Sequence, residues 1–231
     1  MTFSGIIHTL KLLGVGNGLL YLAGRTLQKI SGNKAYIIRY RFVAQPVPEV
    51  VPEIPISSAT HIGHITPGDP LITDFPRPPA VISRRFANQD RCFVAKNKGE
   101  FAGFLWLADG SYEEDEVRCH YILTRPDLSV WDYDVYIAPR FRLGRMFARL
   151  WQVANHFMRE KGIDWSISRI STFNADSLAA HARLGARSLG GATFIVLGPV
   201  QLSILSTAPF LHLSFAANSR PEIFLSPPTQ D

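Results

Sequence analysis

Strand and helix patterns alternate over residues 130–198, and this alternation constrains the fold more than any other feature of the sequence. In chain order it predicts a strand at 131–138, a helix at 143–161, a strand at 164–172, a helix at 175–184 and a strand at 192–198. Gly162 and Gly185 follow the two helical patterns, and a left-handed glycine commonly ends a helix. Such an order is typical of a mixed sheet covered by helices.

The sequence before residue 130 contains mostly strand patterns, at 35–43, 91–96, 101–108 and 117–123. The second and third are separated by Asn97-Lys98-Gly99-Glu100, which predicts an antiparallel hairpin. Four prolines indicate an extended connector between residues 45 and 58, and short helices are expected between residues 66 and 90. We therefore expect an α+β fold with a mixed, mostly antiparallel β-sheet flanked by helices.

The first 30 residues are apolar, but charged side chains and glycines interrupt them. No stretch reaches the ~20 uninterrupted apolar residues that a membrane span needs. Leucines at helical spacing predict an extra amphipathic helix, bent near residues 14–16. Its apolar side either packs on the rest of the protein or makes peripheral contact with a membrane. Residues 202–215 are apolar too, and they predict a further layer of core, a homodimer face or part of the same membrane-facing surface.

The composition excludes some classes of function. Lys and Arg total 24 against 19 Asp and Glu, for a net charge of +5. This excess suits an anionic cofactor or membrane, whereas a nucleic-acid-binding protein would show clustered basic runs, so no nucleic-acid partner is expected. Cys92 and Cys119 lack metal-site spacing and the histidines are scattered, so we expect buried thiols and no metal. The protein is expected to be cytoplasmic, either free or peripheral to the inner face of the membrane.

An arginine-rich loop precedes the long helix. Arg140, Arg142 and Arg145 lie near its N-terminus, where four backbone N–H groups lack helical partners and the dipole adds about half a positive charge. Arginines there oppose the dipole, so a bound anion would relieve an electrostatic cost. The loop therefore predicts a phosphate site, and the alternative is that its arginines are simply solvated.

This loop resembles the phosphate-binding motif of the GNAT superfamily of acyl-CoA-dependent N-acyltransferases. The family has a valine-x-proline strand end, an Arg/Gln-x-x-Gly-x-Gly/Ala loop and a long helix. The chain reads Ile137-Ala138-Pro139-Arg140-Phe141-Arg142-Leu143-Gly144-Arg145-Met146-Phe147. Arg145 and Phe147 stand where the family usually has glycine or a small residue, and Gly144 comes one place early.

A second family motif matches without a gap. It consists of Asn-x-x-Ala/Ser, a tyrosine seven residues after the Asn, and Leu-Gly-Phe/Ala. Its positions are held here by Asn174, Ser177, His181, Leu184, Gly185 and Ala186. Seven residues are about two helical turns, so Asn174 and His181 are expected on one side of the helix. Asn174 is also a natural N-cap, and the two roles are compatible.

The resemblance covers residues 60–198 and implies a GNAT-like fold. It also implies direct transfer of an acyl group from coenzyme A to an amine, with acetyl-CoA as the first donor expected. It implies that His181 protonates the leaving thiolate and that Asp134 accepts the proton of the amine. The expected contacts with coenzyme A are Tyr136, Ile137, Arg142, Leu143, Gly144, Arg145, Met146, Phe147, Asn174 and Ser177. The strand pattern places Asp132 and Asp134 on one face, and an ion pair with Arg118 or Arg169 is the alternative role.

The same residues are also compatible with other functions. The same fold could be an inactive binding module, or an acyltransferase that docks an acyl carrier protein on its three loop arginines. The residues do not identify the acceptor, which is expected to be a small-molecule or peptide amine. The acidic run 113–116 is expected to be a solvated loop that could attract a cationic acceptor. The expected division is an N-terminal part at 1–58, a transferase domain at 59–198 and an apolar extension at 199–231.

Overall fold

The computed structural model describes residues 3–55, 57–216 and 218–229. The chain forms two compact units. The first comprises Met1–Pro46, Ser111–Thr124 and Ile167–Asp231, and the second comprises Val47–Gly110 and Arg125–Ser166. Each unit therefore contains segments that are distant in the sequence. The three consecutive parts expected from the sequence stay a prediction.

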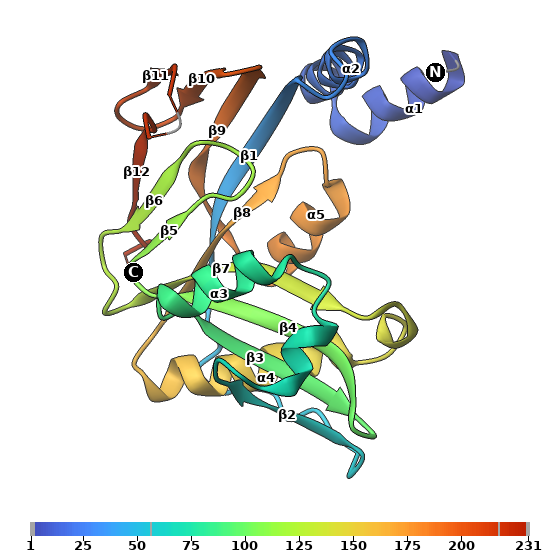
Figure 1. Ribbon diagram of the computed structural model, residues 1–231, viewed down its shortest axis with the longest axis vertical. Coiled ribbons are helices and arrows are strands. Elements are labelled where there is room, and N and C mark those ends of the chain that lie inside the picture. Colours follow the sequence, from blue (N-terminus) through green and yellow to red (C-terminus); the bar gives the residue numbers. More distant parts are fainter. Residues whose placement is uncertain (1–2, 56, 217, 230–231) are drawn as a thin grey trace. The chain divides into compact units, whose positions relative to one another are not determined.

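Among its described residues, the first unit contains three helices and most of the strands. They are α1 Phe3–Leu13, α2 Val15–Ile30, β1 Ala35–Pro46, β5 Ser111–Glu113, β6 His120–Leu123, β8 Trp165–Ser171 (from its third residue), α5 Ala175–Arg183, β9 Arg187–Leu197, β10 Val200–Leu205, β11 Leu211–Ser214 and β12 Glu222–Leu225. The strand order is β11-β10-β9-β1-β8, and β1, β9, β10 and β11 pair antiparallel (Figure 1). A small sheet orders β12-β6-β5, with β12 parallel to β6.

The second unit is an antiparallel sheet with a helix layer on each face. Its elements are β2 Thr60–Ile65, η1 Pro70–Asp74, α3 Pro79–Ala87, β3 Arg91–Asn97, β4 Glu100–Ala108, β7 Ser129–Ile137, η2 Pro139–Phe141 and α4 Met146–Glu160. The strand order is β7-β4-β3-β2. The apolar stripe of α4, including Leu150, Ala154 and Met158, packs on one face of this sheet, and Phe75 and Ile82 pack on the other. Both units combine antiparallel strands with helices, which confirms the predicted α+β class.

Several local predictions are confirmed. The N-terminal helix breaks at Gly14, whose φ is 77°. Gly162 and Gly185 follow α4 and α5 with φ of 75° and 80°. Cys92 and Cys119 are buried, and burial raises the pKa of both thiols.

Some predicted strand boundaries were wrong, and some strands were missed. The strand expected at 117–123 begins only at His120, and β2 and the strands of the C-terminal extension were not foreseen. The acidic run is not wholly solvated. Glu114 is buried and accepts hydrogen bonds from Nε and an NH2 group of Arg169, the latter at 2.5 Å. Among the described residues, no helix combines the length and apolar character needed to cross a bilayer.

Candidate functional site

The N-terminus of α4 offers unpaired backbone donors. Arg145 occupies the N-cap position and makes no side-chain cap bond, so the helix starts without a capping oxygen. The first bond into the helix runs from Arg149 N to Arg145 O at 2.9 Å. Within the described part of the chain, the N–H groups of Met146, Phe147 and Ala148 have no hydrogen-bond partner. Three donors and the positive end of the helix dipole therefore point to the same place.

The three loop arginines are exposed but differ in their contacts. Arg140 pairs with Glu100 at 2.6 Å. Arg142 donates from Nε to the carbonyl oxygen of Ile137 at 3.0 Å, which brings two predicted site residues together. Arg145 has neither an ion pair nor a side-chain hydrogen bond with any residue that the structure describes. Its guanidinium is thus the most available of the three for an external anion.

The last two residues of β7, Tyr136 and Ile137, point their backbone N–H and C=O groups in opposite directions. Ala138 N donates to Ala102 O at 2.9 Å, and Tyr136 stands opposite Phe104 in the ladder. Because backbone groups alternate along a strand, those of Tyr136 face β4 and those of Ile137 point away from it. Of these two residues, only Ile137 therefore turns its N–H away from β4. The two strands approach closely because Gly103 has no side chain; a Cβ there would lie 2.5 Å from the Tyr136 carbonyl oxygen.

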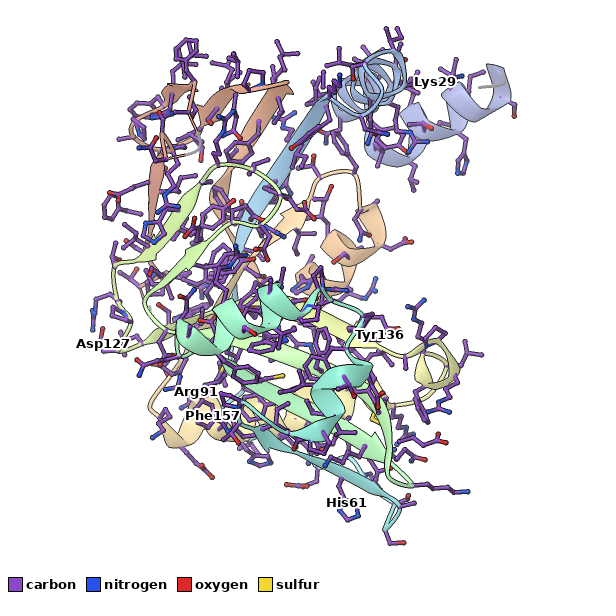
Figure 2. The ribbon with its side chains drawn as sticks, in the orientation of Figure 1. Lys29, His61, Arg91, Asp127, Tyr136 and Phe157 are labelled. Atoms are coloured by element: carbon purple, nitrogen blue, oxygen red, sulfur yellow. The ribbon has the colours of Figure 1, made fainter. Side chains whose placement is uncertain are left out.

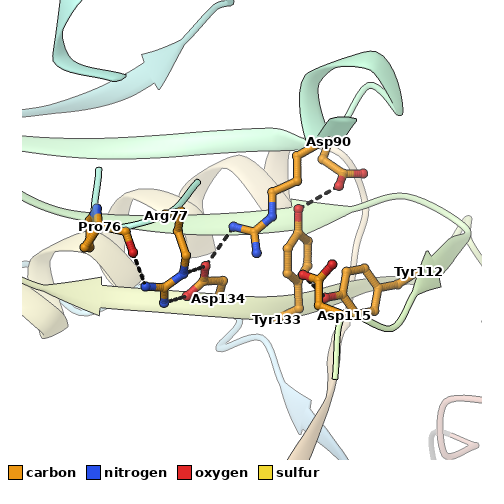
Figure 3. A network of polar contacts seen from close by, with 8 residues as sticks. Pro76, Arg77, Asp90, Tyr112, Asp115, Tyr133 and Asp134 are labelled. Atoms are coloured by element: carbon orange, nitrogen blue, oxygen red, sulfur yellow. Dashed lines mark hydrogen bonds and ion pairs between the residues drawn. The ribbon is translucent and has the colours of Figure 1, made fainter. Parts of the chain in front are cut away.

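Asp134 is the centre of a buried ion cluster (Figure 3). Arg77 donates to its two oxygens at 2.8 and 2.6 Å, and Arg85 adds a contact of 2.7 Å. Asp134 is only 9% exposed. The ion-pair alternative therefore describes Asp134 well, but with Arg77 and Arg85 as partners rather than Arg118 or Arg169.

The expectation that Asp132 and Asp134 share a face was wrong. In the ladder, Trp106 pairs with Asp134 and Leu107 with Asp132, so Tyr133 is an extra residue that forms a β-bulge. The bulge interrupts the alternation of side chains. Tyr133 packs with the cluster around Trp106, next to Asp134, whereas Asp132 accepts a hydrogen bond from Ser166 Oγ at 2.5 Å.

The second predicted motif lies in the first unit, on α5. Asn174 Oδ1 accepts a hydrogen bond from Ser177 N at 3.0 Å, so its capping role is confirmed. His181 lies in the last turn of α5 and is half-buried, and burial lowers the pKa of its imidazole. Its Nδ1 is inaccessible and has no hydrogen-bond partner among the described residues. The imidazole therefore keeps one ring nitrogen without a partner among the described residues.

Two cavities contain charged residues that sequence reasoning did not assign to a pocket. In the second unit, a cavity of about 710 Å³ lies beside Tyr136 and Ala138 and is lined by Asp74, Glu100 and Arg140. In the first unit, a cavity of about 440 Å³ is lined by the acidic run 113–116. The acidic run is visible in the sequence, but neither cavity as a whole is, because each gathers side chains from separate segments. The described ranges hold no group of three His, Cys, Asp or Glu residues that could bind a metal.

Comparison with known proteins gave structural matches only. No family model and no curated protein matches the sequence. A GNAT family acetyltransferase from Elizabethkingia anophelis, solved with acetyl-CoA bound, is 12% identical, with a TM-score of 0.41 over 55% of this chain and 75% of its own. A conserved protein of unknown function from Staphylococcus epidermidis is 10% identical, with a TM-score of 0.48 over 74% and 66%.

A tandem GNAT protein from the clavulanic acid biosynthesis pathway is 15% identical, with a TM-score of 0.46 over 68% of this chain. The chain spans about half, 53%, of that protein's length. The solved structures to which this chain is similar thus include GNAT family acetyltransferases, the family that its two motifs resemble.

Proposed function

We propose that the protein is an acyl-CoA-dependent N-acyltransferase that transfers an acyl group directly to an amine. The observation that carries this proposal is the N-terminus of α4, where three unpaired N–H groups lie next to an arginine-rich loop. Unpaired donors at the positive end of a helix are a ready-made site for a diphosphate. Acetyl-CoA is the first donor to test.

The chain's residues fit an anionic donor. Met146, Phe147 and Ala148 would donate backbone N–H bonds, and Arg145 would add a charge-assisted bond. Arg142 would have to leave the Ile137 carbonyl, or bind the donor with its remaining N–H groups. Asn174 uses its oxygen for the helix cap, which leaves its amide N–H groups to donate.

Coenzyme A supplies the acyl group as an activated thioester with a thiolate leaving group. When the nitrogen–carbon bond forms and the carbon–sulfur bond breaks, the sulfur needs one proton and the amine must lose one. His181 is the proposed donor to the sulfur. Burial lowers its pKa, which makes its protonated form a stronger acid and a less populated one at neutral pH. The contacts of Asp134 favour an ion-pair role over proton removal, so the amine would release its proton to solvent water.

The proposed acceptor is a cationic amine. Its place would be the cavity beside Tyr136, because Asp74 brings a carboxylate to the wall and Phe101 stacks on Tyr136 with ring centroids 6.1 Å apart, whereas Glu100 in the same wall is paired with Arg140. Carboxylates and aromatic faces both attract ammonium groups. Figure 2 labels Tyr136 among the side chains of this unit.

The decisive experiment is calorimetric titration of the full chain with acetyl-CoA. Arg145→Gln should raise Kd about tenfold, since one charge-assisted hydrogen bond is lost. The control is Arg159→Gln at the other end of the same helix, where Arg159 pairs with Asp164 at 2.6 Å, and it should bind as the wild type does. Absence of heat with the wild type would refute the donor site. Binding without thiol release against a panel of amines would support the inactive module instead.

A further inference from the structure

Positive charge is concentrated at the start of the chain. Residues 1–48 contain no Asp or Glu and six of the 24 Lys and Arg residues, whereas the other 18 are balanced by 19 acidic residues. The six are Lys11, Arg25, Lys29, Lys34, Arg39 and Arg41. The net charge of the whole protein therefore arises from α1, α2, β1 and the turn before β1, which all belong to the first unit.

Helix α2 carries an apolar stripe on the side that faces away from its neighbours. Its buried side is marked by Gly18 against Leu10 of α1 and by Gly24 against Ile37 of β1. The opposite side carries Val15, Leu19 and Ile30, which are 68%, 56% and 81% exposed. These three fall within about 60° around the helix at 100° per residue. A surface helix normally turns polar residues outward, so this face is reversed.

The sheet face beside α2 also carries apolar side chains on its outer side. Ile37, which α2 covers, aligns through the strand register with Ile195, Leu202 and Leu213. Two positions further along the strands, Ile204 of β10 pairs with Leu211 of β11. Their side chains are 45% and 62% exposed, respectively.

Polar side chains occupy the other face of this hairpin. Gln201, Ser203 and Ser214 are almost completely buried. Gln201 exchanges hydrogen bonds with the backbone of Arg118 at 2.8 and 2.7 Å, so the interior is satisfied by polar contacts. Leu205 is buried on this face, whereas Ile204, Leu211 and Leu213 are left on the outside of the sheet.

Two more features link these surfaces. Gly198, in the turn between β9 and β10, donates to the Lys34 carbonyl at 2.7 Å, which joins the end of α2 to the start of the hairpin. In Figure 1 the helix pair and β10–β11 lie at the same end of the first unit. Residues 188–219 contain no Asp, Glu, Lys or Arg, so apart from Arg187 at the start of β9 no residue of β9–β11 with a formal charge at neutral pH would have to be dehydrated on insertion.

We propose that this apolar face, defined by Val15, Leu19, Ile30, Ile204, Leu211 and Leu213, docks on the surface of an anionic membrane. Interfacial binding combines buried apolar area with attraction of basic residues to anionic lipids, and the first unit supplies both. Lys29 lies beside the stripe on α2, Arg25 lies one turn before it on the same side, and Figure 2 shows Lys29 at the helix pair. Arg39 and Arg41 are exposed on the side of β1 that bears Ile37.

Charge decides between a membrane and a second copy of the chain. Pairing two copies through this face would bring together two segments with six cations and no acidic residue each, and like charges across an interface are repulsive. Anionic lipid has the opposite sign. This inference does not depend on the proposed acyl transfer, because it concerns other residues and needs no donor.

The test is flotation of the full chain with vesicles, without any acyl donor. Wild type should float with vesicles of phosphatidylcholine and phosphatidylglycerol, and binding should fall steeply with phosphatidylcholine alone or at high salt. Leu19→Gln with Ile30→Gln should weaken binding about tenfold or more, because Gln keeps the helix but not the apolar surface. Leu211→Thr with Leu213→Thr should act in the same direction.

The matched control is Val50→Gln, a residue 85% exposed in the second unit, which should bind as the wild type does. Equal binding by the wild type and the Leu19/Ile30 variant would overturn the proposal. So would a dimer, detected by sedimentation, that the same two substitutions dissociate while no vesicle is bound. A chain that binds vesicles but not acetyl-CoA would leave this inference standing and refute only the proposed function.

Discussion

Asp134 shows how a single residue can satisfy a sequence motif and still have a different environment. A carboxylate near the end of this strand was expected to act as a base. Two guanidinium groups instead donate three hydrogen bonds to its oxygens. These contacts hold the residues around Arg77 and Arg85 against the strand.

Asp134→Asn should therefore lower the free energy of unfolding by about 3 kcal/mol, because the buried charge of Arg85 loses this acceptor. Urea denaturation measures the change. Asp109→Asn, which breaks the exposed pair with Arg91, is the control and should cost about 1 kcal/mol or less. Unchanged stability with abolished turnover would contradict the ion-pair role and restore the general base.

His181 should produce a characteristic pH profile in the transfer step. If its protonated form donates to the sulfur, the rate falls about tenfold for each pH unit above about 6.5, since burial lowers the pKa further. Single-turnover measurements with an acceptor amine of low pKa isolate this step. His181→Gln should remove the slope, and an identical profile in this variant would exclude His181 as the acid.

At the scale of elements, α5 depends on its cap. Asn174→Ala should destabilise the first unit by about 1 kcal/mol, because Ser177 N loses its acceptor. Asn174→Asp keeps an acceptor oxygen and serves as the control. Thermal unfolding reports the cap, and titration with acetyl-CoA reports any direct contact. A variant that no longer binds acetyl-CoA but is as stable as the wild type would show that Asn174 acts in binding alone.

Elements differ in how far the sequence could define them. Helix α4 was predicted from its apolar stripe and from Gly162, although it begins three residues later than expected, after the turns of residues 142–145. Strand β2 was missed because His61, Gly63 and His64 give it no apolar alternation. It is a strand because β3 supplies its hydrogen-bond partners.

At the scale of the whole molecule, two histidines couple protonation to stability. Burial lowers the pKa of His64, with a further effect from Arg91, and burial lowers that of His181. The unfolded chain therefore binds protons more readily than the folded chain below pH about 6.5. Above that pH both forms are neutral and these residues leave stability unchanged. The free energy of unfolding should fall as the pH drops from about 6.5 through the lowered pKa values.

Urea denaturation at a series of pH values tests this sign. The double variant His64→Gln/His181→Gln should show a shallower fall over the same range. A wild type that becomes more stable on acidification, or a double variant with the same slope, would rule out the linkage.

Local chemistry allowed the helices, the hairpin of β3 and β4, the glycine stops and the Asn174 cap to be predicted, because each depends on residues within a few positions of one another. The bulge at Tyr133, the partners of Asp134 and the outward apolar face of β10–β11 were not predictable in this way. Each arises when segments distant in the sequence meet, and a side chain's partner or face is then set by packing and backbone pairing rather than by its neighbours in the chain.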